Sequence, residues 1–233
     1  MTDSIFDRTL VISPHLDDET IGCGGTISRL RREGKEVYVL IATAPIVFTA
    51  PHLHTEVDTL ERVDSFNNAM DILSVDEGHR LKLDKRYDEG HLDTYPIMEI
   101  ITSLDRVITE VKPTAVLFPY SSHHQDHQIL NQASIAALRP KVSSNFIKLK
   151  AMYEYPYITG WNSAVTQSSR IYISLDGQDF NTKKLALKAY ASQLNRDPRD
   201  PINISSIMSL MEMRGHEVGT NLAESLYPIT LTI

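Results

Sequence analysis

The chain has 233 residues, of which 42% are hydrophobic and 23% charged, a length that suits one sizeable α/β domain or two small ones. Its formal net charge of -7 argues against a nucleic acid or an anionic membrane as a partner, because both select basic surfaces. Neither a signal peptide nor membrane insertion is expected, since the opening residues are charged and no apolar run approaches about 18 residues, and the single cysteine, Cys23, fits the reducing cytoplasm.

The start of the chain alternates strand and helix patterns. Residues 9–13 and 37–43 are apolar runs typical of buried strands. Residues 25–34, between them, predict a helix that ends at Gly34, because glycine accepts the left-handed conformation that helix ends often need.

The middle of the chain repeats this alternation. Apolar side chains recur at helical spacing over residues 62–73 and, as a wide stripe, over residues 96–111. Residues 112–119 then predict a buried strand, and a helix is expected to start near Asp126. Strand, helix and strand repeated at this pitch predict parallel βαβ units with right-handed crossovers, and therefore the α/β class.

The second half is less regular. Residues 147–156 and 169–176 predict strands, residues 181–194 predict a helix with Asn181 as its N-cap, and residues 204–215 predict another helix. No repeat, low-complexity tract or change of composition marks a second domain, so we interpret residues 1–233 as a single domain.

Two polar clusters follow two of the predicted strands. "SPHLDDETIGCGG" (residues 13–25) follows the first strand, and "YSSHHQDHQ" (residues 120–128) follows the strand "AVLFP". Open α/β sheets bind ligands beyond the carboxyl ends of their strands, so we expect both clusters at one edge of the sheet. Two imidazoles and a carboxylate, with one position left to water, are the ligands of a catalytic zinc site, whereas calcium or magnesium favours oxygen ligands. The candidate side chains are His15, Asp17, Asp18, Glu19, His123, His124, Asp126 and His127.

Each cluster alone fits a second interpretation, in which its histidines and aspartates cap a helix or hydrogen-bond within a loop. The glycines Gly22, Gly24 and Gly25 could cradle a phosphate, but their spacing is not GxGxxG, and close packing under the loop explains them better. The occurrence of both clusters at equivalent strand ends favours the metal site.

The first cluster, in "VISPHLDDETIGCGGTI", resembles the N-terminal signature of the LmbE/PIG-L zinc-dependent de-N-acetylases, whose core is written (A/P)HPDDE. "HQDH", residues 124–127, resembles their second motif, HxDH, and the two motifs are specific in combination. Weaker similarities extend over most of the chain, in "RVDSFNNAMDILSV", "LKAYASQL" and "MRGHEVGTNLAESL". The resemblance implies a Rossmann-like three-layer sandwich with a mostly parallel sheet. Two positions depart from the pattern: Leu16 replaces the usual proline, and Ser65 stands where an acidic residue often follows the arginine by three.

By resemblance, Asp17 is the general base and zinc is bound by His15, Asp18 and His127. Adjacent side chains diverge, so one aspartate can bind the ion while the other faces water, whose pKa zinc lowers to about 7. The resemblance also implies that His124 stabilises the oxyanion as an imidazolium and that Asp126 orients it. Another divalent transition metal would suit the same ligands.

Substrate contacts are predicted at two further residues. Arg62 resembles the family's substrate-binding arginine, with a surface salt bridge as the alternative. Asp84 could hydrogen-bond a sugar hydroxyl, with a simple turn residue as the alternative. The sequence leaves open the roles of His52, His54, His123 and Tyr153–Tyr155.

The sequence thus predicts a zinc-dependent hydrolase that removes an acetyl group from an N-acetylglucosamine-like sugar or conjugate. The hydrolytic metal site follows from the residues, and the sugar amide follows from the resemblance alone. The alternatives are a metal-dependent hydrolase of another amide or ester, and a non-catalytic sugar- or nucleotide-binding protein on the same fold. The presence of Asp17 beside a full set of candidate metal ligands speaks against the binding protein, because a protein that only binds a sugar or nucleotide needs no general base. The exact substrate and the oligomeric state, a homo-oligomer included, are left open.

Overall fold

A central β-sheet organises the protein, for which a computed structural model describes residues 5–45, 48–50, 55–156, 169–194, 197 and 199–232. Within these residues the sheet has seven strands in the order β5-β2-β1-β6-β7-β9-β8. Their bounds are β1 Arg8–Ser13, β2 Glu36–Ile41, β5 Arg80–Lys82, β6 Ala115–Pro119, β7 Leu149–Tyr153, β8 Ile171–Leu175 and β9 Leu222–Leu231. A separate pair is formed by β3 (Phe48–Ala50) and β4 (Thr55–Val57).

The sheet is mostly parallel, which confirms the predicted fold class. β1 pairs in parallel with β2 and with β6, and β7 continues the parallel set beside β6. The pairing of β1 with β6 positions the site, because it brings the chain that follows Ser13 and the chain that follows Pro119 to the same edge of the sheet.

The long strand β9 has no counterpart among the predicted elements. It runs antiparallel to both β7 and β8. Its sequence, LAESLYPITL, interrupts the apolar run with Glu224, Ser225 and Pro228. The pairing with β7 shifts register beside Ala151, the partner of Pro228, and such an irregularity is where a strand tolerates proline.

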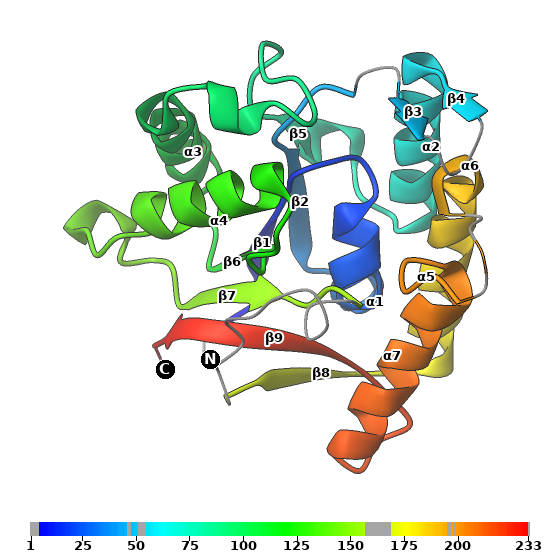
Figure 1. The fold of residues 1–233 in the computed structure, drawn as a ribbon. Helices are drawn as coiled ribbons and strands as arrows, with labels where there is room; N and C mark the ends of the chain where they lie inside the picture. Colours follow the sequence, from blue (N-terminus) through cyan, green and yellow to red (C-terminus); the bar gives the residue numbers. More distant parts are fainter. Residues whose placement is uncertain are drawn as a thin grey trace.

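Helices cover both faces of the sheet, with α3 and α4 on one side and α1, α2, α5 and α7 on the other (Figure 1). Their bounds are α1 Asp18–Arg32, α2 Thr59–Ile72, α3 Ile97–Val111, α4 Gln125–Ala137, α5 Gly177–Ala189, α6 Ala191–Leu194 and α7 Ile204–Glu217. No helix in the described part of the chain is long and apolar enough to cross a membrane.

Two predicted helix starts are wrong. α1 begins at Asp18, well before residue 25, so the glycine cluster lies inside the helix instead of preceding it. α5 is capped by Asp176, whose side chain accepts hydrogen bonds from the amides of Gln178 and Asp179. Asn181 lies within that helix, because the capping box of Asp176 and Asp179 starts it earlier.

The glycines of α1 let neighbouring elements approach the helix closely. A Cβ atom on Gly22 would lie 2.2 Å from Cδ2 of Tyr153, and one on Gly25 would lie 2.6 Å from Cδ1 of Leu175. Close packing, which the sequence favoured over a phosphate cradle, is therefore what Gly22 and Gly25 provide.

This packing predicts that Gly22→Ala destabilises the protein by about 1–3 kcal/mol, the usual cost of overpacking a core. Gly177→Ala is the matched control, because no atom lies within 4 Å of the Cβ position there. Urea denaturation of both variants measures the difference. Equal stability of Gly22→Ala and the parent protein would contradict the packing described here.

Candidate metal centre

The first half of the site is the turn between β1 and α1. Asp17 has a φ of 138°, a conformation that non-glycine residues rarely adopt and that is usually held by surrounding contacts. Glu19 supplies those contacts: its Oε2 accepts the amide of Asp17 at 3.2 Å and the hydroxyl of Ser13 at 3.4 Å. The hydroxyl of Tyr190 donates to the other oxygen of Glu19 at 2.8 Å. Glu19 therefore supports the loop instead of contacting the other candidate ligands.

The second half is the N-terminal end of α4. His124 is the N-cap of this helix, and its Nδ1 accepts the amide of Asp126 at 3.2 Å. His127 lies in the first turn of the helix, and its ring packs 5.0 Å from the ring of Tyr155.

The two halves meet at a carboxylate oxygen. Oδ2 of Asp18 lies 3.1 Å from Nδ1 of His15 and 3.3 Å from Nε2 of His127. Ligands at the usual zinc distances of about 2.0–2.1 Å are separated by about 3.3–3.4 Å in a tetrahedral site. Two imidazoles and one buried carboxylate at these separations therefore fit a borderline divalent ion such as zinc.

A second grouping shares two of these residues. Nitrogen atoms of His15, His124 and His127 lie within 4.8 Å of one another, so these three histidines could also hold a metal ion. Asp18 is the stronger candidate for the third ligand, because its oxygen already contacts both of the shared imidazoles. One ring nitrogen of His124 is also occupied by the helix amide.

The electrostatics of this cluster favour a cation. Burial opposes charge on His15, yet the carboxylates of Asp126 and Asp18 raise the pKa of its ring well above the ordinary value. Burial likewise opposes ionisation of Asp18, but His127 and His15 hold its pKa below the ordinary value. A buried carboxylate needs positive charge beside it, and a divalent metal would supply that charge.

Asp126 contacts His15 instead of His124. Its Oδ2 lies 2.8 Å from Nε2 of His15, and its oxygens accept the amides of Gly90 at 2.5 Å and Leu92 at 2.9 Å. Among the described residues, its link to His124 runs through its backbone amide. The expected orientation of His124 by the Asp126 carboxylate is therefore not seen; the carboxylate orients the candidate ligand His15, in the manner of a carboxylate–histidine–zinc triad.

His124 is neutral at physiological pH. Burial, together with His15 and His127, lowers its pKa to about 4. The imidazolium that the resemblance implied is therefore disfavoured, and the positive end of the α4 dipole acts in the same direction. Because Nδ1 accepts a hydrogen bond, the neutral ring carries its proton on Nε2 and can donate from there.

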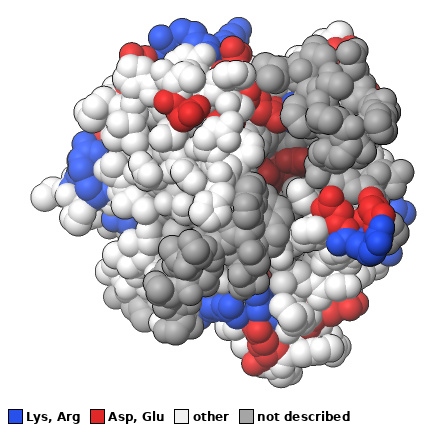
Figure 2. Space-filling view, viewed as in Figure 1, with Lys and Arg blue, Asp and Glu red and all other residues white. Residues whose placement is uncertain are grey.

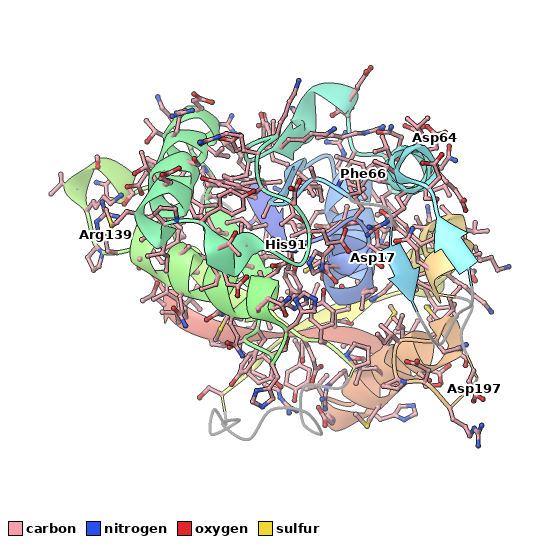
Figure 3. All side chains as sticks on the ribbon, turned by 45° about the horizontal axis from the view of Figure 1, so that its top comes forward. Asp17, Asp64, Phe66, His91, Arg139 and Asp197 are labelled. Carbon is pink, nitrogen blue, oxygen red and sulfur yellow. The ribbon has the colours of Figure 1, made fainter. Side chains whose placement is uncertain are left out.

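The carboxylate of Asp17 is oriented differently from that of Asp18. It is partly buried and has no hydrogen bond among the described residues. Burial and the neighbouring Asp18 raise its pKa well above the ordinary value, while Arg62 acts against them. In Figure 3, Asp17 lies between the loop that carries His91 and helix α2, which carries Asp64. Figure 2 shows acidic side chains set back in a hollow near the N-terminal end of α1.

Arg62 lies next to this group on α2 and is buried, so it does not form the surface salt bridge that was its alternative. Its guanidinium binds Glu89 with both terminal nitrogens, at 2.5 Å and 3.0 Å. Its Nε donates to Gln193 at 3.3 Å. Glu89 and Gln193 therefore fix the orientation of Arg62.

Asp84 does not belong to this group of residues. Its carboxylate accepts the backbone amide of Arg86 at 3.0 Å and the guanidinium of Arg86 at 2.8 Å, as a turn residue does. His123, which belongs to the second cluster, is exposed to solvent. His52 and His54 lie outside the described residues.

Sequence reasoning missed the loop that carries Glu89 and Gly90. Glu89 holds Arg62, and Gly90 donates its amide to Asp126, so the loop contacts both sides of the site. The glycine in "YDEGHL" was the one local signal, since Gly90 has a φ of 80° that favours glycine.

A family model described as "PIG-L: GlcNAc-PI de-N-acetylase" matches residues 10–138, more than half of the chain and both polar clusters. The chain belongs to this family. The PIG-L family is one of deacetylases, and the relatives of this chain include deacetylases of N-acetylated sugars.

Two curated relatives and one solved structure illustrate the similarity. The chain is 28% identical over 191 residues to the uncharacterized deacetylase YaiS of Escherichia coli K12, covering 78% of this chain and 90% of that protein. It is 30% identical over 127 residues to the diacetylchitobiose deacetylase of Thermococcus kodakarensis, covering 52% of this chain and 45% of that protein. The zinc-inhibited form of teicoplanin deacetylase has a TM-score of 0.73 at 19% identity, covering 95% of this chain and 97% of that chain, which shows a common fold.

The position of Asp126 predicts that Asp126→Asn weakens metal binding about 10–100-fold, because the amide cannot hold the His15 ring as a charged carboxylate does. Asp93→Asn, an exposed position near the same loop, is the control and should bind metal normally. Competition with a chelator measures both affinities. If Asp126→Asn matched its control, Asp126 would have no part in holding the ligand.

Proposed function

We propose that residues 1–233 form one zinc-dependent hydrolase domain that removes an acetyl group from an N-acetylglucosamine-like sugar or sugar conjugate. The observation that carries this proposal is the Asp17 carboxylate, which is free of hydrogen bonds in the described part of the chain and adjoins Asp18. A general base next to the candidate metal ligand Asp18 serves catalysis, whereas a protein that only binds a sugar does not require one. The N-acetylated sugar is supported by the relatives, one of which is named a diacetylchitobiose deacetylase.

A cytoplasmic location is proposed on the free, buried thiol of Cys23.

His15, Asp18 and His127 would hold the ion. When bound, zinc supplies Lewis acidity, which polarises a carbonyl and makes water more acidic. Asp17 takes a proton from water as the water oxygen forms its bond to the amide carbon. Asp17 then returns that proton to the nitrogen as the C–N bond breaks, so that acetic acid and the amine are released. The raised pKa of Asp17 suits both halves of this exchange, because the group must accept and release a proton near neutral pH.

His124 meets the charge that develops on the carbonyl oxygen. Its neutral ring presents Nε2–H to the oxyanion, and the N-terminal end of α4 adds its positive dipole. A neutral donor at a helix N-terminus keeps its proton as the negative charge forms.

The direct test is acetate release from N-acetylated glycosides by the metal-loaded protein. Asp17→Asn should retain its metal and lose about 10²–10⁴-fold in kcat, the usual contribution of a positioned acid/base group. Asp64→Asn, on the exposed side of α2, is the control and should keep full activity. Full activity of Asp17→Asn on a substrate that the parent protein deacetylates would remove Asp17 from the mechanism.

The neutral state of His124 gives a second prediction. His124→Ala should lose about 10²–10³-fold in kcat, and His124→Gln less, because its amide still offers an N–H donor. The group titrates near pH 4, so it causes no loss of activity as the pH rises through 7 and 8. Activity should instead fall on the acid side, as Asp17 becomes protonated below its raised pKa. An alkaline limb in the parent pH–rate profile that disappears in His124→Gln would show that an imidazolium is required after all.

A further inference from the structure

A cavity of about 340 Å³ lies between α2 and the edge of the sheet formed by β2 and β5. Its apolar walls come from the β1–α1 turn, the end of β2, α2 and β5. The wall residues are Leu16, Ile41, Val63, Phe66 and Leu81.

This space is too large to be a packing void. Protein interiors are close-packed and hold few voids larger than a water molecule, whereas small-molecule sites begin at about 300 Å³. Its walls are fixed, since Leu16 is 3%, Ile41 2% and Phe66 5% exposed. An apolar cavity with rigid walls gains stabilising contacts when an apolar ligand fills it.

The cavity and the metal centre lie at the same edge of the sheet, at neighbouring strands. Leu16, which lines the cavity, stands between His15 and Asp17 in the chain. Ala44, also in its wall, exchanges backbone hydrogen bonds with the loop of Tyr87 and Glu89, at 2.6 Å and 3.1 Å. Glu89 in turn binds Arg62, the residue next to Val63.

The charged side chains of the lining are either exposed to solvent or paired with a neighbour. Glu77, Lys82 and Lys85 are exposed. Two further charges are neutralised locally, since Arg80 pairs with Asp71 and Asp84 pairs with Arg86. The buried part of the lining is therefore mostly apolar, and it includes Leu16, which lies between His15 and Asp17 in the chain.

We propose that this cavity receives an apolar aglycone of the N-acetylated sugar, an inference that rests on the proposed deacetylase function. Ligands of open α/β sheets lie along the carboxyl ends of the strands, and the metal centre at β1 and β6 and the cavity at β2 and β5 occupy consecutive parts of that edge. With the amide at the metal centre, the remainder of the sugar lies beside Arg62 and its alkyl or aryl substituent enters the cavity.

The test compares hexyl and methyl glycosides of N-acetylglucosamine. Each buried methylene group is worth about fourfold in affinity, so kcat/KM should be at least about tenfold higher for the hexyl glycoside. Val63→Phe fills the cavity from α2, and the hexyl-to-methyl ratio should then fall to about one. Leu60→Phe, on the exposed face of the same helix, is the matched control and should keep the parent ratio.

Three results would overturn the proposal. The first is a hexyl-to-methyl ratio near one in the parent protein, and the second is a ratio that Val63→Phe leaves unchanged. The third is a Val63→Phe-sensitive preference for N-hexanoylglucosamine over N-acetylglucosamine, which would assign the cavity to the acyl group instead of the aglycone.

Calorimetry with the hexyl glycoside separates this proposal from the proposed function. If the parent protein binds the hexyl glycoside and Val63→Phe binds it at least tenfold more weakly, the cavity assignment holds even where no acetate is released. If neither acetate release nor binding of the hexyl glycoside is detected, the cavity assignment fails as well.

Discussion

The site depends on one buried carboxylate oxygen, Oδ2 of Asp18, which contacts imidazoles from two distant parts of the chain. A buried carboxylate is costly unless positive charge and hydrogen bonds compensate it. Here the compensation comes from His15, its sequence neighbour, and from His127, which the pairing of β1 with β6 brings alongside. A divalent metal placed between these groups would supply such positive charge, and the candidate ligands already lie close together.

The C-terminal half of the chain supports this arrangement from behind α1. Glu224 on β9 accepts the amides of Gly25 and Thr26 in the middle of the helix, at 2.9 Å and 2.7 Å. Lys183 on α5 binds Glu224 at 2.6 Å and the carbonyl of Ile21 at 2.7 Å. These buried groups, of which Glu224 belongs to the late motif "MRGHEVGTNLAESL", hold the helix that carries Asp18.

The sequence was sufficient for four of the parallel strands, β1, β2, β6 and β7, and for the juxtaposition of the two clusters, but it did not reveal the short, partly exposed parallel strand β5. Both rest on local patterns, the apolar strands "TLVIS" and "AVLFP" followed directly by polar residues. The sequence was insufficient for those features of the structure that tertiary packing determines. β9 buries Glu224 and Ser225 against polar partners, so its burial leaves no apolar pattern. The partner of Asp126 and the charge state of His124 depend on which side chains surround them, and no spacing along the chain reveals that.

The number of imidazoles bound to the metal decides whether Asp18 or His124 completes the ligand set. X-ray absorption spectroscopy of the zinc-loaded protein counts imidazole ligands through their multiple-scattering signature. We expect two imidazoles together with oxygen ligands, and a spectrum that His124→Ala leaves unchanged, because Asp18 and not His124 would complete the set with His15 and His127. A signature of three imidazoles that falls to two in His124→Ala would contradict it and would make His124 a metal ligand.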